Sequence, residues 1–110
     1  GRVYTPKVTK DYEAKIKKAY LTAASGYSFG EEPIRISITA FFKKAKSNKN
    51  IYATKKPDVD NIAKIVLDGL NGVAYNDDSQ VIYISAAKVY GDEYDNAPCI
   101  YIEVENGRGI

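Results

Sequence analysis

The sequence predicts an α+β fold, a single domain in which a mixed β-sheet is covered by two α-helices. Its 110 residues are enough for one domain with a modest core. Hydrophobic residues make up 45% of the chain and charged residues 27%, as in ordinary globular proteins. The spacing of apolar residues changes from helical to alternating and back, which predicts the order helix, strand, helix, strand, strand.

The first helix is expected from Lys10 to about Ala24. Residues 1–8 are expected to be extended, because the proline at position 6 holds its predecessor out of the helical region. Thr9 can then cap the helix, whose apolar residues recur at steps of three and four. Lysines occupy much of the remaining surface, so the helix is amphipathic and basic. This lysine face is equally compatible with phosphate contact and with simple solvation.

The second element is a strand. Apolar side chains at every other position of residues 34–43 predict a strand covered on one face. A polar loop rich in Lys, Asn and Ser follows from Lys43 to Lys56 and leads directly into the central helix.

The central helix is expected to begin near residues 58–60, because Pro57 is tolerated at a helix start. Asn71 and Gly72 are expected to end it, since Gly readily takes the left-handed conformation found at helix ends. The apolar residues between these limits recur at helical spacing and form one stripe: Ile62, Ile65, Val66, Leu70 and Val73.

Two further strands complete the predicted sheet. Residues 81–90 are apolar on both faces and are expected to form an interior strand. Residues 91–98 read as a connection, and residues 99–104 are rich in β-branched and aromatic side chains and predict the last strand. We also expect this domain, residues 1–110, to lack an N-terminal strand that would lie before Gly1.

Composition excludes several classes of enzyme. The chain has no histidine and one cysteine, which excludes histidine-based zinc hydrolases, Ser-His-Asp triads, Cys-His nucleophiles and internal disulfides. Any chemistry must come from carboxylates, Lys, Tyr or a bound ion. No apolar run approaches membrane-spanning length and no targeting segment is evident, so no membrane partner is expected.

Charge is divided unevenly along the chain. Residues 1–56 contain 13 basic and 4 acidic residues, whereas residues 57–110 contain 3 basic and 10 acidic ones. This division suggests a basic surface for a polyanion beside an acidic centre for a cation, although the two sets could also intermingle on folding. The lysines of the polar loop could hold a phosphate backbone: Lys43, Lys44, Lys46, Lys49, Lys55 and Lys56. A base could stack on Tyr52 in this loop, although aromatic residues at loop edges more often pack on their own domain.

The acidic centre is the densest set of potentially catalytic groups, and it comprises Asp58, Asp60, Asn61, Lys64, Asp68, Asp77 and Asp78. Asp60, Lys64 and Asp68 are four residues apart and share a helix face. If the strand after residue 80 packs beside the helix, Asp78 could return to Asp58 and Asp60. Hard divalent cations such as Mg²⁺ prefer such oxygen ligands and keep positions for water and substrate phosphate. The pattern therefore indicates metal-dependent phosphodiester cleavage.

A structural interpretation of the same residues stays open. Aspartates at helix starts are usually caps, and Asp-Asp before a strand is usually a solvated turn. Spacing alone does not decide between these uses and a metal site.

The segment KPDVDNIAKIVLDGLNGVAYNDDSQV resembles the RusA family of Holliday junction resolvases, homodimeric Mg²⁺-dependent endonucleases encoded in bacteria and their prophages. The family pattern runs Asp-x-Asp-Asn, a Lys shortly after, Asp-Ala-Leu-Asn-Gly or similar, then Asp-Asp-Xaa-Gln-Val. The chain matches it nearly throughout, with DGLNG in the middle. The segment GRVYTPKVTKDYE is also similar, so the resemblance covers most of the chain. Family members usually carry a strand and a short basic segment upstream of this point.

The resemblance implies roles for individual residues. Asp58, Asp60 and Asp78 would hold the metal, and Lys64 would be the essential basic residue. Asn61 would support them. Asp77 and Asp68 belong to the motif region in structural or supporting roles. The implied cofactor is Mg²⁺, or Mn²⁺ in its place.

The expected function is resolution of Holliday junctions by symmetric phosphodiester hydrolysis in DNA recombination and repair. The resemblance implies a cytoplasmic homodimer, of bacterial or phage origin, bound to a four-way DNA junction. Two alternatives remain: a nucleic-acid-binding protein without catalysis, and a nuclease that acts on duplex or flap DNA.

Overall fold

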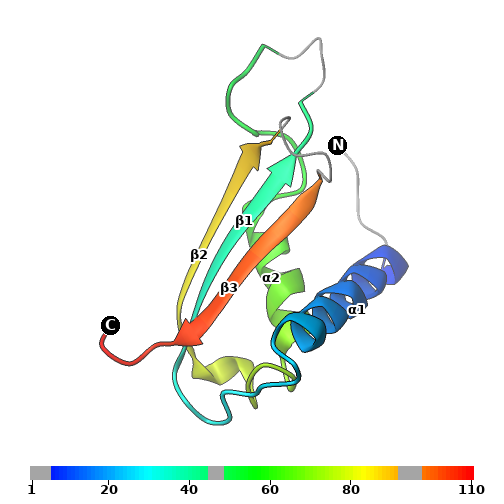
Figure 1. Cartoon of the computed structure of the whole chain (residues 1–110). Coiled ribbons are helices and arrows are strands. Elements are labelled where there is room, and N and C mark those ends of the chain that lie inside the picture. Colours follow the sequence, from blue (N-terminus) through cyan, green and yellow to red (C-terminus); the bar gives the residue numbers. More distant parts are fainter. Residues whose placement is uncertain (1–5, 45–48, 92–97) are drawn as a thin grey trace.

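The computed structural model describes residues 6–44, 49–91 and 98–110, in which two α-helices pack against a three-stranded sheet (Figure 1). Its elements in order are α1 (Pro6–Ala23), β1 (Ile34–Phe42), α2 (Val59–Leu70), the short 3₁₀ helix η1 (Asp78–Gln80), β2 (Val81–Tyr90) and β3 (Cys99–Asn106). The predicted order of helices and strands is confirmed, with η1 as an addition. None of the helices within the described residues is long and apolar enough to cross a lipid bilayer.

The three strands form one mixed sheet with β1 in the centre, in the order β2-β1-β3. β1 runs parallel to β2 and antiparallel to β3. The alternating residues Ile34, Ile36, Ile38 and Ala40 of β1 are buried, as predicted for a strand covered on one face. They join buried side chains of both helices in a single core, which confirms the predicted mixed sheet covered by two helices.

Helix α2 lies along the sheet and carries the predicted apolar stripe. Its buried residues are Ile62, Ile65, Val66, Gly69 and Leu70. The helix begins directly after Asp58, and the chain turns away at Asn71 and Gly72, where Gly72 adopts a φ of 76°. The predicted start and end of this helix are therefore confirmed.

Helix α1 begins earlier than the sequence pattern predicted. It starts at Pro6 and not at Lys10, so the expectation of extended backbone is wrong for residues 6–8. The pattern was misread because proline restricts the residue before it but is itself well suited to the first helical position. Residues 1–5 lie outside the described residues.

β2 was expected in the interior of the sheet, and this expectation is wrong. Within the described residues it is an edge strand, paired only with β1. Its apolar residues on both faces therefore remain partly open, with Ile82 56% and Ile84 39% exposed. An apolar run on both faces of a strand indicates coverage, but the residues that the structure describes leave this edge partly uncovered.

Close contact between the two helices depends on Gly69. A Cβ atom at this position would lie 2.9 Å from both Cβ and Cγ2 of Ile16 and 3.1 Å from the carbonyl oxygen of Glu13. Ile16 is itself buried in the core. The missing side chain therefore lets α1 approach α2 closely enough to share the core.

Replacing this glycine tests the packing of the helices. Gly69→Ala should lower the free energy of unfolding. Overpacking usually costs about 1–3 kcal/mol, and the higher helix propensity of alanine offsets roughly 1 kcal/mol of that cost. Urea denaturation measures the change. The control is Thr22→Ala at the exposed end of α1, which should leave stability unchanged or slightly higher. A Gly69→Ala protein more stable than the wild type would contradict the contact.

Candidate active site

The amino end of α2 presents a carboxylate that is not used as a helix cap. Asp58 occupies the N-cap position, but its side chain makes no capping hydrogen bond. The ammonium of Lys56 instead donates to both Asp58 carboxylate oxygens, at 2.9 and 2.8 Å. This hydrogen bond, with the charges of Lys56 and Lys88, lowers the pKa of Asp58 below its usual value. Asp58 is thus exposed, ionised and already paired with a cation.

Two further candidates lie on the first turns of the same helix. Asp60 is in the first turn and Lys64 follows one turn later on the same face, and both are exposed. Asn61 is also exposed between them. The structure therefore brings Asp58, Asp60 and Lys64 to one end of the molecule, as predicted.

A lysine that the sequence analysis did not single out holds this end in place. The Lys88 ammonium, from β2, donates to the carbonyl oxygens of Lys55 and Pro57, each at 2.8 Å. Pro57 is buried, so these contacts fix the chain directly before Asp58. A signal was present in the sequence, because Lys88 is the single charged residue in the apolar run of residues 81–90.

Asp78 belongs to a different end of the molecule. It starts η1, beyond the carboxyl end of α2, and accepts a hydrogen bond of 2.8 Å from the hydroxyl of Tyr75, which is buried. Burial and the nearby charges of Asp68 and Asp77 raise the pKa of Asp78, although the Tyr75 hydrogen bond acts in the opposite direction. Burial and the Asp78 contact in turn raise the pKa of Tyr75.

Asp77 has a structural role of the kind that the alternative interpretation described. Its carboxylate accepts a hydrogen bond from the Ser79 amide at 2.9 Å, and its own amide donates to Oε1 of Gln80 at 2.8 Å, forming a capping box. The side-chain amide nitrogen of Gln80 also donates to the carbonyl oxygens of Gly30 and Glu32, at 2.7 and 2.8 Å. Much of the Asp-Asp-Ser-Gln segment therefore anchors the turn that leads into β2.

The predicted convergence of three carboxylates within one chain is wrong. α2 has 12 residues, so at 1.5 Å per residue its two ends are about 18 Å apart, with Asp58 and Asp60 at one and Asp78 past the other. Across the described ranges, no group of three or more acidic, cysteine or histidine residues lies close enough to hold one metal ion. The prediction failed because Asp78 lies in η1, past the carboxyl end of α2, and only the later part of β2, near Lys88, returns to the amino end of the helix.

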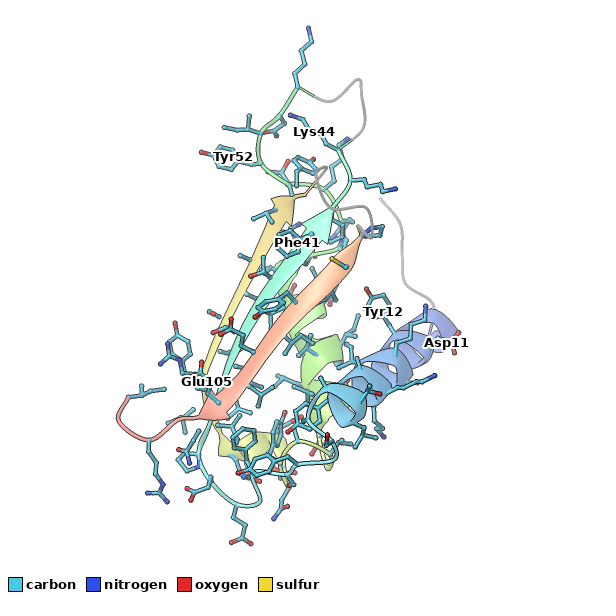
Figure 2. All side chains as sticks on the ribbon, in the orientation of Figure 1. Asp11, Tyr12, Phe41, Lys44, Tyr52 and Glu105 are labelled. Atoms are coloured by element: carbon cyan, nitrogen blue, oxygen red, sulfur yellow. The ribbon has the colours of Figure 1, made fainter. Side chains whose placement is uncertain are left out.

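We call residues 43–56 the lysine-rich loop, and its described residues, 43–44 and 49–56, lie beyond the end of β1 (Figure 2). Lys43, Lys49, Lys55 and Lys56 are exposed, whereas Lys46 lies outside the described residues. The ammonium of Lys44 lies 5.8 Å from the centroid of the Tyr90 ring. Because this loop continues directly into Asp58, its positive charges and the carboxylates of α2 are at the same end of the molecule. Their role in holding a phosphate backbone stays a prediction.

Comparison with known proteins gives two similar curated sequences. The "Uncharacterized protein YqaN" of Bacillus subtilis (strain 168) is 48% identical over 52 residues, which are 46% of this chain and 37% of that protein. The "Crossover junction endodeoxyribonuclease rusA" of Lactococcus phage r1t is 36% identical over 59 residues, 52% of this chain and 45% of that protein. The matched part therefore spans less than half the length of either relative.

The family comparison covers nearly the whole chain. Residues 1–105 match the model of the family described as Endodeoxyribonuclease RusA. This match confirms the resemblance carried by the Asp-x-Asp-Asn and Asp-Asp-Ser-Gln segments, and it joins the amino end of α2 and the turn before β2 in one family pattern. The chain belongs to the RusA endodeoxyribonuclease family.

Proposed function

We propose that this chain is the subunit of a metal-dependent endodeoxyribonuclease that resolves four-way DNA junctions. Membership of the RusA family and the similarity to the phage crossover junction endodeoxyribonuclease support this function. The structural observation that carries it is the amino end of α2. There the Asp58 carboxylate, which makes no capping hydrogen bond, directly precedes the helix that carries Asp60 in its first turn and Lys64 one turn later, where the lysine-rich loop meets the helix.

The residues at this end suit a Mg²⁺ ion. Mg²⁺ is usually held by one or two carboxylates and keeps water and phosphate in its other positions. Asp58 and Asp60 would be those carboxylates, and the pairing of Asp58 with the Lys56 ammonium is consistent with a cation at this position. When bound, the metal supplies an activated water and neutralises charge on the phosphate.

Phosphate binding and charge stabilisation would come from groups of the chain itself. The unpaired N–H groups at the amino end of α2 carry partial positive charge and favour phosphate oxygens. Lys64, one turn beyond Asp60, would stabilise the negative charge that develops on the phosphate during hydrolysis. Lys88 would position the site, because it holds the two carbonyls directly before Asp58.

The role of Asp78 requires a second copy of the chain. β2 starts near Asp78 and ends near the amino end of α2, where Lys88 contacts Pro57. Two copies paired antiparallel through their β2 edges would bring Asp78 of each copy toward Asp58 and Asp60 of the other. The exposed apolar residues of this strand support such an interface: Ile82, Tyr83 and Ile84. A homodimer would then complete both metal sites and offer two equivalent centres to the matching strands of a junction.

The direct test compares a junction, a linear duplex and a flap. Wild-type protein should cut the junction with Mg²⁺ and none of the substrates with EDTA. Asp60→Asn should lower the cleavage rate by about 100-fold or more while junction binding persists, because it removes a metal ligand but no phosphate contact. Glu103→Gln, an exposed residue on β3 at the opposite edge of the sheet, is the control. Failure of the wild type to cut any substrate would reject the enzyme, and preferential cutting of duplex or flap would reject the resolvase.

A mixture of two inactive proteins tests the shared site. Asp60→Asn and Asp78→Asn should each be inactive alone. In a mixed dimer one site carries both substitutions and the other carries neither, so mixing after subunit exchange should restore nicking of one strand. Gel analysis of a junction labelled on both strands measures it. If the mixture stays inactive although mass measurement shows mixed dimers, Asp78 does not complete the partner's site.

The positioning role of Lys88 predicts a change in metal requirement. Lys88→Met keeps the apolar stem but loses both hydrogen bonds to the carbonyls that precede Asp58. The Mg²⁺ concentration for half-maximal cleavage should therefore rise about tenfold or more. Titration of Mg²⁺ at saturating junction measures the shift. Lys88→Arg, which keeps a cationic donor, should recover part of it. An unchanged Mg²⁺ requirement in Lys88→Met would show that the contact serves stability alone.

A further inference from the structure

Two adjacent apolar side chains project from the lysine-rich loop. Among the described residues, Ile51 at 73% and Tyr52 at 68% are the most exposed large hydrophobic side chains of the molecule. Figure 2 shows Tyr52 pointing away from the sheet, on the part of the loop that extends past the end of β1. Tyr52 does not pack on its own domain, which was the more common outcome for an aromatic residue at a loop edge.

The backbone around this pair is held in a defined turn. The Asn50 side-chain oxygen accepts a hydrogen bond from the Tyr52 amide at 3.0 Å, and the Thr54 amide donates to the Tyr52 carbonyl, also at 3.0 Å. Asn50 further donates to the Thr54 hydroxyl at 3.3 Å. Ala53, between these contacts, is buried. The turn is therefore anchored through its small residue while its two large side chains face solvent.

The surroundings of the pair favour a polyanion. Residues 43–57 contain six lysines and no acidic residue. A surface for another protein would more often combine apolar residues with charges of both signs, whereas apolar side chains between lysines suit bases attached to a phosphate backbone. Downstream, the loop is fixed by Lys88 through the Lys55 carbonyl and runs into the carboxylates of α2. The pair is thus connected to the proposed cleavage site by a short, restrained segment.

We propose that Ile51 and Tyr52 contact the bases of the DNA at the branch point, with Tyr52 stacking on a base and Ile51 filling the space beside it. A four-way junction exposes base faces at its centre, where continuous stacking is interrupted. Side chains that insert between bases partly unstack them and bend the DNA. This inference rests on the proposed function, and it adds how the protein distinguishes a branch point from a continuous duplex.

The absence of tryptophan from the chain makes stacking directly measurable. Tyr52→Trp introduces a single indole, whose fluorescence should be quenched and blue-shifted by a junction in EDTA, and less by a duplex of the same sequence. The control is Tyr101→Trp on β3, because Tyr101 is similarly exposed at 57% but lies outside the loop. Its fluorescence should be unchanged. In a second readout, 2-aminopurine at the branch point should brighten on binding wild-type protein and not on binding Tyr52→Ala.

Removal of the aromatic ring should also weaken the affinity for the junction. Tyr52→Ala should weaken junction binding about fivefold or more, the lower end of what base–aromatic stacking contributes, and should weaken duplex binding less. Tyr101→Ala should bind the junction as the wild type does. Unquenched Tyr52→Trp together with wild-type affinity of Tyr52→Ala would overturn the proposal, and a change in oligomeric mass of Tyr52→Ala would assign the pair to a protein interface.

The outcome is separable from that of the proposed function, because fluorescence and affinity are measured without cleavage. Quenching of Tyr52→Trp by a junction that wild-type protein never cuts would keep the base contact and reject the nuclease. Normal junction cleavage by the wild type, without quenching of Tyr52→Trp, would keep the nuclease and reject the base contact.

Discussion

The packing of α2 between the sheet and α1 determines where every candidate catalytic group lies. Its apolar stripe is buried against β1, and the bare backbone at Gly69 allows α1 to close over it. A straight helix held along the sheet cannot bring its two ends together. The same packing that forms the core therefore keeps Asp58 and Asp60 apart from Asp78, so the metal site that we propose would be incomplete in a single chain.

The separation of the two acidic ends suggests a role for the exposed β2 edge of the sheet. A strand that is apolar on both faces normally lies in the interior, and an exposed edge of this kind is prone to pairing with another chain. β2 runs along the direction that separates the two acidic ends, so antiparallel pairing of two copies would exchange those ends. One interface would thereby cover the apolar edge and assemble the carboxylates. The fold and the proposed chemistry would then depend on the same contact.

The sequence was informative wherever a local pattern decides the structure. Alternation in β1 and the stripe, proline and glycine of α2 identified both elements, because they reflect burial on one face and backbone preference. The start of α1 was misjudged from a rule about the residue before proline. The interior position of β2 could not be decided, since apolar residues on both faces show that a strand is covered but not which molecule covers it.

The arrangement predicted for the candidate site was right only where helix geometry decides it. Asp58, Asp60 and Lys64 share one end of α2 because their spacing along one helix and its N-cap fixes their places. The place of Asp78 depends on the direction of β2, and that of Lys88 depends on which strand end meets the loop before α2. Neither is encoded in local spacing. Asp77 shows the opposite case, where a motif carboxylate is accounted for by a capping box.

The central claim is that two copies share each metal site, and the most direct measurement is the anomalous scattering of Mn²⁺ in crystals of the protein. The account predicts one or two Mn²⁺ ions bound by Asp58 and Asp60 of one subunit, with Asp78 of the second copy close enough to complete each site. Mn²⁺ held by Asp68, Asp77 and Asp78 of a single subunit, with none at the amino end of α2, would contradict it.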